Sequence, residues 1–311
     1  MQLLALNSRM KIVYFVVIMQ FCFITFNAYG GCKKLYPHTD PTNVGKWVLN
    51  TEISDEFNDK VLDEKKWLIQ GRNGEYKSKW LGRNPSQFST ENVRIENNML
   101  KLQTRWEPNF SFANKEKDGY AYGKLKTTDS TYTMPITTAA VIARTAFLYG
   151  YMEIKCKAAD ASVTSAFWGT GSGMELDVFE HLGKPSIRKK IQLETELWSS
   201  IHDWSIKGGP SVWTDRLQLP FRVASDFHVY GLDWSEDGLK FYADGKLVRE
   251  VSKQQVLDTE ETKKSGSRGW VVDKPLYIWV DSEVFPWHGM PLKEDLPADY
   301  EIEYIRVWQK K

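Results

Sequence analysis

Short apolar or alternating runs that end in turn residues recur along most of this chain, and they restrict the folds available to it. Residues 92–102 hold two such runs around Asn97-Asn98. Residues 227–251 hold three more, separated by Asp237-Gly238 and Asp244-Gly245. Residue pairs of this kind are typical of two-residue β-hairpin turns. The pattern therefore predicts antiparallel strands joined by tight turns.

The remaining runs extend this prediction over the rest of the chain. Residues 139–146 and 149–158 are interpreted as a hairpin joined near Gly150, and residues 252–262 as one short helix. Two late strands are expected, at residues 276–280 and 302–308. Nothing resembling a linker interrupts the chain after residue 46. Many short strands in one uninterrupted domain predict an all-β fold, a jelly-roll β-sandwich of two curved antiparallel sheets.

Residues 175–180 (ELDVFE) place three carboxylates within six positions. On a regular strand side chains alternate, so Glu175 and Asp177 share one face and Glu180 lies on the other. One β-bulge, which inserts an extra residue, would bring all three acids onto one face. Three acids on one face repel one another and must be solvated, paired or used in chemistry. A solvated edge strand and an acid–base site are the two interpretations.

The N-terminal residues 1–31 are expected to be an export signal and not part of the fold. An apolar run, residues 12–26, follows two basic residues and precedes small ones, as in secretory signal peptides, and is too short for a membrane span. Cleavage after Ala28-Tyr29-Gly30 and lipid attachment at Cys32 both fit the residues that follow. We therefore expect an exported protein, secreted or lipid-anchored at the cell surface, with residues 32–46 as a tether.

The composition argues for a large core and against several kinds of partner. The 311 residues include 41 basic and 40 acidic ones without a basic block, which argues against nucleic-acid binding. The 13 Trp suit a β core or a surface on which sugars stack. Beyond the signal, only Cys32 and Cys156 remain, too few for a disulfide framework. No His pair has metal-ligand spacing, so no metal site is predicted.

Residues 175–180 match the E-[IL]-D-x-x-E signature of glycoside hydrolase family 16 in its bulged form. Other segments resemble that family in the same order: residues 55–58 (DEFN), residues 136–155 with their YGYxE ending, Trp168, Asp233-Trp234 and residues 301–308. The resemblance spans residues 47–309. It implies a catalytic domain over residues 47–311 in which the concave sheet carries the acids in an open substrate cleft.

Two further segments point to the branch of this family that degrades red-algal galactans. Residues 80–85 (WLGRNP) are similar to the WxGP segment of agarases and porphyranases, and residues 276–287 to an agarase segment. The NLAVGG-like strand of laminarin- and lichenan-cleaving relatives is missing. The resemblance implies an endo-acting hydrolase of β-1,4-galactosidic bonds in agarose or porphyran. Furcellaran or β-carrageenan, and a β-glucan, remain alternative substrates.

The resemblance assigns Glu175 as the nucleophile and Glu180 as the general acid/base. Asp177 between them would hydrogen-bond Glu175 and modulate the protonation of the pair. Retaining glycosidases hold the two carboxyl groups about 5–5.5 Å apart, which two Glu side chains leaning together on a bulged strand can reach. The expected mechanism is a double displacement with net retention.

Aromatic and polar residues around these acids are candidates for substrate binding. Indole rings stack on apolar sugar faces, and a guanidinium suits hydroxyls or sulfate esters. Each candidate also has a plainer interpretation in the core or on a solvated surface. The candidates are Trp80, Arg83, Arg144, Trp168, His181, His202, Trp204, Glu283 and Trp287, whereas Trp67, Trp234 and Trp308 are assigned to the core.

A carbohydrate-binding lectin on the same sandwich is the alternative from another class. It would need the Trp platform but not the three acids, so the intact trio favours the enzyme. No cofactor is required for hydrolysis by two carboxyl groups; the resemblance leaves room for a structural calcium ion, for which the sequence identifies no ligands. We expect a monomer whose partner is a polysaccharide and whose membrane contact is limited to a lipid anchor.

Overall fold

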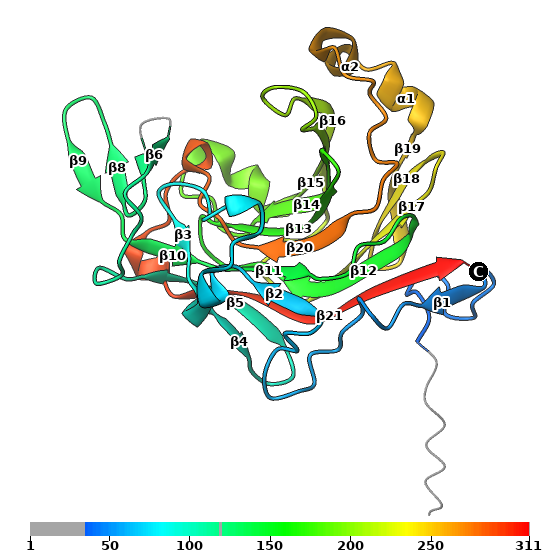
Figure 1. The fold of residues 1–311 in the computed structure, drawn as a ribbon, viewed down its shortest axis with the longest axis horizontal. Helices are drawn as coiled ribbons and strands as arrows, with labels where there is room; N and C mark the ends of the chain where they lie inside the picture. Colours follow the sequence, from blue (N-terminus) through cyan, green and yellow to red (C-terminus); the bar gives the residue numbers. More distant parts are fainter. Residues whose placement is uncertain (1–34, 118–119, 311) are drawn as a thin grey trace, which may run out of the picture. The chain divides into compact units, whose positions relative to one another are not determined.

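The computed structural model describes residues 35–117 and 120–310, in which two β-sheets lie one over the other (Figure 1). The larger sheet has ten strands in the order β19-β18-β17-β12-β21-β5-β10-β3, with β1 beside β21 and β4 beside β5. Its strands are β1 (Trp47–Leu49), β3 (Gln87–Phe88), β4 (Val93–Ile95), β5 (Leu100–Trp106), β10 (Ile136–Thr138), β12 (Gly150–Lys157), β17 (His228–Trp234), β18 (Gly238–Ala243), β19 (Lys246–Ser252) and β21 (Ala298–Lys310).

The second sheet has seven strands in the order β16-β15-β14-β13-β20-β11-β2, all paired antiparallel. They are β2 (Trp67–Ile69), β11 (Ala140–Ala143), β13 (Thr164–Gly171), β14 (Met174–Leu182), β15 (Glu196–Asp203), β16 (Ser211–Gln218) and β20 (Tyr277–Asp281). Because β14 lies in the middle of this sheet, its acids are flanked by side chains from strands on both sides.

Smaller elements extend from the two main sheets. A separate four-stranded sheet comprises β6 (Glu116–Lys117), β7 (Tyr120–Ala121), β8 (Lys124–Lys126) and β9 (Thr131–Thr133). The helices are α1 (Lys253–Leu257), α2 (Glu260–Ser265) and the 3-10 turns η1 (Arg72–Gly74), η2 (Lys77–Lys79), η3 (Thr90–Asn92), η4 (Arg188–Thr195), η5 (Pro286–His288) and η6 (Lys293–Asp295). None of the helices in the described residues is long and apolar enough to cross a membrane.

The core fills the space between the two large sheets. Ile154 and Ile305 of the ten-stranded sheet, and Phe167, Leu176 and Val280 of the seven-stranded sheet, are completely buried in one continuous cluster. Full burial of one such side chain contributes about 1.5–3 kcal/mol. The opposite face of the seven-stranded sheet is therefore the one that is free to carry polar chemistry.

Most of the predicted turns are confirmed. Asn97 and Asn98 have φ of 54° and 56°, and Glu96 and Met99 exchange both backbone hydrogen bonds across this turn between β4 and β5. The hairpins of β17, β18 and β19 are also present. Trp67, Trp234 and Trp308 are fully buried, as expected. Together these findings confirm the all-β sandwich.

The predicted hairpin of residues 139–158 is wrong. Strand β11 pairs with β2 and β20 in one sheet, whereas β12 pairs with β17 and β21 in the other. Tyr149 and Gly150 adopt positive φ of 56° and 140°, and the chain crosses between the sheets there instead of folding back. Both strands are apolar on their core-facing sides, so the sequence pattern could not separate a hairpin from a crossover.

The single helix predicted over residues 252–262 is two helices, α1 and α2. Ser252 caps α1 by accepting from the backbone N–H of Gln255, and Thr259 caps α2 by accepting from that of Thr262. A second N-cap side chain within the segment starts a new helix at that point.

Residues 35–46, predicted as part of a tether, instead lie against the ten-stranded sheet. The indole of Trp308 donates to the carbonyl oxygen of Leu35 (2.9 Å), and the backbone N–H of His38 donates to Glu153 (2.8 Å), a fully buried carboxylate. The compact unit therefore begins at Leu35 and not at residue 47. The predicted signal peptide and Cys32 lie outside the described residues.

Replacing Gly150 by Ala tests the crossover. A Cβ there would lie 2.4 Å from the carbonyl oxygen of Trp308, in addition to the cost of its positive φ. We expect Gly150→Ala to lower the free energy of unfolding by about 2–4 kcal/mol. Gly74→Ala is the matched control, because Gly74 has φ of 78° with nothing within 4 Å of the new Cβ. Equal losses for the two variants in urea unfolding would contradict this account.

Candidate active site

Strand β14 carries the three carboxylates and contains the predicted β-bulge. Against β13, Phe167 pairs with Phe179, whereas the next residue, Trp168, pairs with Asp177. Val178 is therefore the extra residue, and the alternation of side chains shifts by one position there.

The bulge separates the acidic side chains of β14 from the apolar ones. Leu176, Val178 and Phe179 are buried in the core between the sheets. The three acids alternate with them and lie on the other face, where Glu175 and Glu180 remain partly exposed and Asp177 is 3% exposed. A regular strand would have sent Glu180 into the core.

Burial and mutual repulsion raise the pKa of all three acids, but unequally. Burial, and then the charge of Glu175, raises the pKa of Glu180 to about 8. The pKa of Asp177 is raised well above its usual value by burial and by both glutamates. Burial also raises the pKa of Glu175, although His202 and Trp204 oppose this rise. At neutral pH Glu180 therefore holds a proton, while Glu175 is the acid whose anion has the best support.

The partners of Glu175 come from strand β15 and the loop that follows it. The indole of Trp204 donates to a carboxylate oxygen of Glu175 at 3.0 Å, and His202 is its backbone pairing partner. His202 Nε2 lies 3.6 Å from Asp177, and its Nδ1 is 3.1 Å from the carbonyl oxygen of Gly209. That carbonyl only accepts, so Nδ1 carries a proton. The structure thus brings two predicted site residues, His202 and Trp204, to the nucleophile position.

Potential metal-ligand atoms of Glu175, Asp177 and His202 all lie within 4.8 Å of one another. Carboxylate and imidazole ligands of this kind suit zinc. The sequence did not predict this group, because His202 lies on a different strand from the acids. A cation held there would occupy the carboxylate that has to attack a sugar.

Trp168 lies beside Asp177 on the same face of the sheet. Its indole stacks on Trp279 of β20 (ring centroids 4.7 Å apart, interplanar angle 28°) and donates to Asp281 at 3.1 Å. Trp168 stays partly exposed whereas Trp279 is buried beneath it, so the pair can present one supported aromatic surface to a sugar.

Trp80, Arg83 and Glu283 form one network above β20. The indole of Trp80 donates to one carboxylate oxygen of Glu283 (2.8 Å), and Arg83 Nε donates to the other (3.2 Å). Glu283 is only 6% exposed. The prediction that it accepts hydrogen bonds from sugar hydroxyls is therefore corrected, since both of its oxygens already have partners and it instead orients Trp80 and Arg83.

Trp287 extends this network towards solvent. It is 49% exposed, and the Arg83 guanidinium lies 5.3 Å from its ring centroid. Trp204 is similarly exposed, at 52%. Large indole surfaces of this kind are rarely left in water without a partner, which agrees with their predicted role in binding sugar.

His181 does not belong to this face, and its predicted contact with substrate is corrected. The side chain is 1% exposed and packs between Phe179 and Tyr230, with its Nδ1 at 3.0 Å from the carbonyl oxygen of Glu196. The same bulge that turns Glu180 outward turns the next residue into the core. Burial lowers the pKa of His181 to about 3, so it stays neutral.

Arg144 lies apart from the carboxylates. Its Nε donates to the carbonyl oxygen of Glu64 at 2.7 Å, and it borders a hollow formed with Lys77 and Tyr277. The predicted role in contacting the sugar at the scissile bond does not fit this position.

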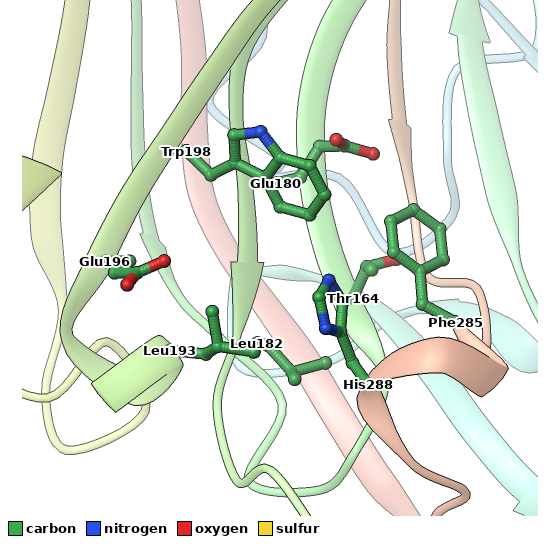
Figure 2. Close-up of a pocket in the computed structure, with 8 residues that line it drawn as sticks. All are labelled: Thr164, Glu180, Leu182, Leu193, Glu196, Trp198, Phe285 and His288. Atoms are coloured by element: carbon green, nitrogen blue, oxygen red, sulfur yellow. The ribbon is translucent and has the colours of Figure 1, made fainter. Parts of the chain in front are cut away.

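A small pocket adjoins Glu180 at the end of β14 (Figure 2). Its volume of about 10 Å³ is that of roughly one water molecule, far too small for a sugar ring. The residues around it include Thr164, Glu196, Trp198 and His288. A sugar must therefore lie over the open face of the sheet, and the close packing here explains why burial dominates the pKa of Glu180.

The sequence analysis missed Trp279 and Asp281, which support Trp168. Positions 277, 279, 281 and 283 alternate along β20 and share the face of the acids. That period-two pattern was visible in the sequence, and it would have identified both residues once the strand was placed beside β13.

Comparison with known proteins agrees with this geometry. Residues 47–310 match the family model described as the β-porphyranase A–D domain of glycoside hydrolase family 16. β-Porphyranase D of Zobellia galactanivorans is 29% identical over 282 residues, which cover 83% of this chain and 59% of the relative. β-Porphyranase B of the same organism is 27% identical over 298 residues, 88% of each protein.

Two further relatives show the breadth of the similarity. κ-Carrageenase of Pseudoalteromonas carrageenovora is 27% identical over 288 residues, 85% of this chain and 65% of the relative. The crystal structure of porphyranase B from Zobellia galactanivorans superposes with a TM-score of 0.63 at 25% identity, covering 85% of this chain and 92% of that one. The jelly-roll fold is thus shared with solved structures.

The pKa of Glu180 predicts the alkaline limit of any hydrolysis at this site. A general acid must hold its proton, so kcat/KM should fall as the pH rises through about 8. Initial rates measured from neutral to alkaline pH would show this fall, and Glu180→Gln should remove most of the activity. A rate that stays constant through pH 8 and above would contradict the role of Glu180.

The group formed by Glu175, Asp177 and His202 predicts inhibition by zinc. Added Zn²⁺ should lower the activity by occupying the attacking carboxylate, and EDTA should restore it without lowering the activity of the untreated protein. His202→Gln should weaken the inhibition. Loss of activity on treatment with EDTA alone would instead indicate a catalytic metal.

Proposed function

This chain belongs to glycoside hydrolase family 16, in the β-porphyranase A–D group, and we propose that it cleaves β-1,4-galactosidic bonds within red-algal galactans of the agarose or porphyran type. The observation that carries the proposal is the bulged strand β14, which sets Glu175, Asp177 and Glu180 side by side on an open sheet face. The stacked Trp168 beside them supplies a surface for a sugar ring.

In the first step Glu175 attacks the anomeric carbon while Glu180 gives its proton to the departing glycosidic oxygen. The bond between the sugar and this oxygen breaks, and an ester between the sugar and Glu175 forms. In the second step Glu180, now ionised, takes a proton from water. The resulting hydroxide attacks the same carbon and releases Glu175, so the configuration is retained.

Asp177 supports both steps as a positioning residue. It lies between the glutamates and is more deeply buried than either, so its own ionisation is the most strongly disfavoured. A protonated Asp177 can donate a hydrogen bond to Glu175 and so stabilise the carboxylate that leaves in the second step.

The similarity to β-porphyranases supports a porphyran-like substrate, while the similarity to κ-carrageenase keeps furcellaran or β-carrageenan as a second candidate. The exposed Trp287 and Trp204 lie on the two sides of the carboxylates, next to Arg83 and Glu175 respectively. An open arrangement of this kind favours attack within a polymer over removal of its terminal units.

The apolar N-terminal run supports export of the protein, with Cys32 as the site of lipid attachment or Gly30 as the end of the signal. Labelling of cells with a fatty-acid analogue distinguishes these cases. A label that disappears in Cys32→Ser supports the anchor, and an unlabelled protein in the medium supports secretion. A monomer without cofactor is sufficient for the proposed reaction.

Product analysis on agarose, porphyran, furcellaran and carrageenans tests the proposed function. We expect new reducing ends, and oligosaccharides of several sizes early in the reaction, on agarose or porphyran. Glu175→Gln should lower the rate at least a thousandfold, since it removes the nucleophile. Binding to these polymers without any new reducing end would support a lectin, and cleavage of laminarin alone would indicate a β-glucanase.

A further inference from the structure

A second hollow lies on the same face of the seven-stranded sheet, to one side of the carboxylates. Its volume is about 280 Å³, close to the lower limit of small-molecule sites. Its walls are formed by Leu68, Glu75, Tyr76, Lys77, Arg144 and Tyr277. The space is large enough for one sugar ring or for a bulky substituent.

Strand pairing fixes the position of this hollow relative to the site. Tyr277 of β20 pairs with Thr170 of β13, which pairs with Glu175 of β14. Two strand spacings separate Tyr277 from Glu175, or about 10 Å. A polymer that crosses the strands over Glu175 would therefore reach the hollow with a sugar beyond the one that is attacked.

The hollow carries positive charge with little to balance it. The Lys77 ammonium lies 3.0 Å from the ring centroid of Tyr277, and among the described residues no carboxylate oxygen comes within 4.0 Å of it. Burial, and then the charge of Arg144, lowers the pKa of Lys77. The nearest carboxylate to Arg144 is that of Glu75, at 3.9 Å and on a side chain that is 58% exposed.

Both cations are held in place before any ligand arrives. Gln70, which is 1% exposed, accepts from the backbone N–H of Lys77 (2.8 Å) and donates to the carbonyl oxygens of Lys77 and Trp80. Arg144 is fixed by its hydrogen bond to Glu64. Little ordering is needed on binding, which favours a specific contact over a diffuse one.

Arg83 differs from these two cations, because the buried Glu283 already neutralises it at 3.2 Å. An anion gains less at a guanidinium that has a buried counter-charge than at an ammonium that has none. Within the described part of the chain, the sulfate recognition considered for both Arg83 and Arg144 therefore fits the hollow better.

We propose that this hollow binds a sulfate ester on a galactan sugar that lies beyond the attacked one, with Lys77 and Arg144 contacting the ester oxygens. Leu68 and Tyr277 provide apolar surface for the ring that carries the ester. The inference rests on the proposed function, and it makes Lys77 a residue that determines specificity for sulfated over neutral galactan.

The test compares Lys77→Gln with Lys79→Gln on a sulfated galactan and on its desulfated form. Lys79 is exposed in the same turn but does not line the hollow, so it is a matched control for charge. We expect Lys77→Gln to lower kcat/KM on the sulfated polymer about tenfold, because one charge-assisted contact is lost, and to leave the desulfated polymer within about twofold. Lys79→Gln should leave both nearly unchanged.

Equal losses on both polymers, or no loss on either, would overturn the sulfate assignment. Calorimetry with sulfated oligosaccharides keeps this result separate from the proposed function. Using Glu175→Gln as the inactive background, adding Lys77→Gln should weaken binding about tenfold, whichever polymer the active protein cleaves. If no galactan is cleaved and this weakening is still seen, the proposed function fails and the inference stands; unchanged binding would refute the inference.

Discussion

One extra residue in a single strand, Val178, determines the arrangement of the whole site. It lets β14 bury Leu176, Val178 and Phe179 in the core while all three acids share the opposite face. Without the bulge, either Glu180 would lie among apolar side chains, at a cost of several kcal/mol, or Phe179 would be exposed. Core packing therefore holds the acids together, because the strand can bury its apolar residues in no other register.

The same packing supplies the electrostatic asymmetry that a two-carboxylate mechanism needs. Glu180 borders the small pocket near Trp198, where burial keeps its proton bound. Glu175 receives a hydrogen bond from the exposed Trp204 and feels the nearby His202. Two chemically identical side chains five positions apart thus take the roles of acid and nucleophile because their surroundings differ. Arg83, held by Glu283, lies outside this division of roles and orients the aromatic rim.

Much of this arrangement could be predicted from the sequence, and the failures have physical causes. The bulge follows from the spacing of acids and apolar residues in residues 175–180, and the Asn97-Asn98 turn from local backbone preference. The crossover at Gly150 could not be predicted, because two apolar strands look the same whether they pair or separate. The burial of His181 and the pairing of Glu283 depend on neighbours from distant strands, and the hollow at Lys77 joins three segments that are far apart in the chain.

The configuration of the first product released tests the central claim most directly. If Glu175 attacks the sugar and Glu180 serves as acid and then base, NMR spectra recorded in the first minutes of hydrolysis should show the β-anomer of the new reducing end, followed by slow mutarotation. Initial appearance of the α-anomer would show inversion by a single displacement. It would contradict the role assigned to Glu175 and, with it, the reason given for bringing the acids onto one face.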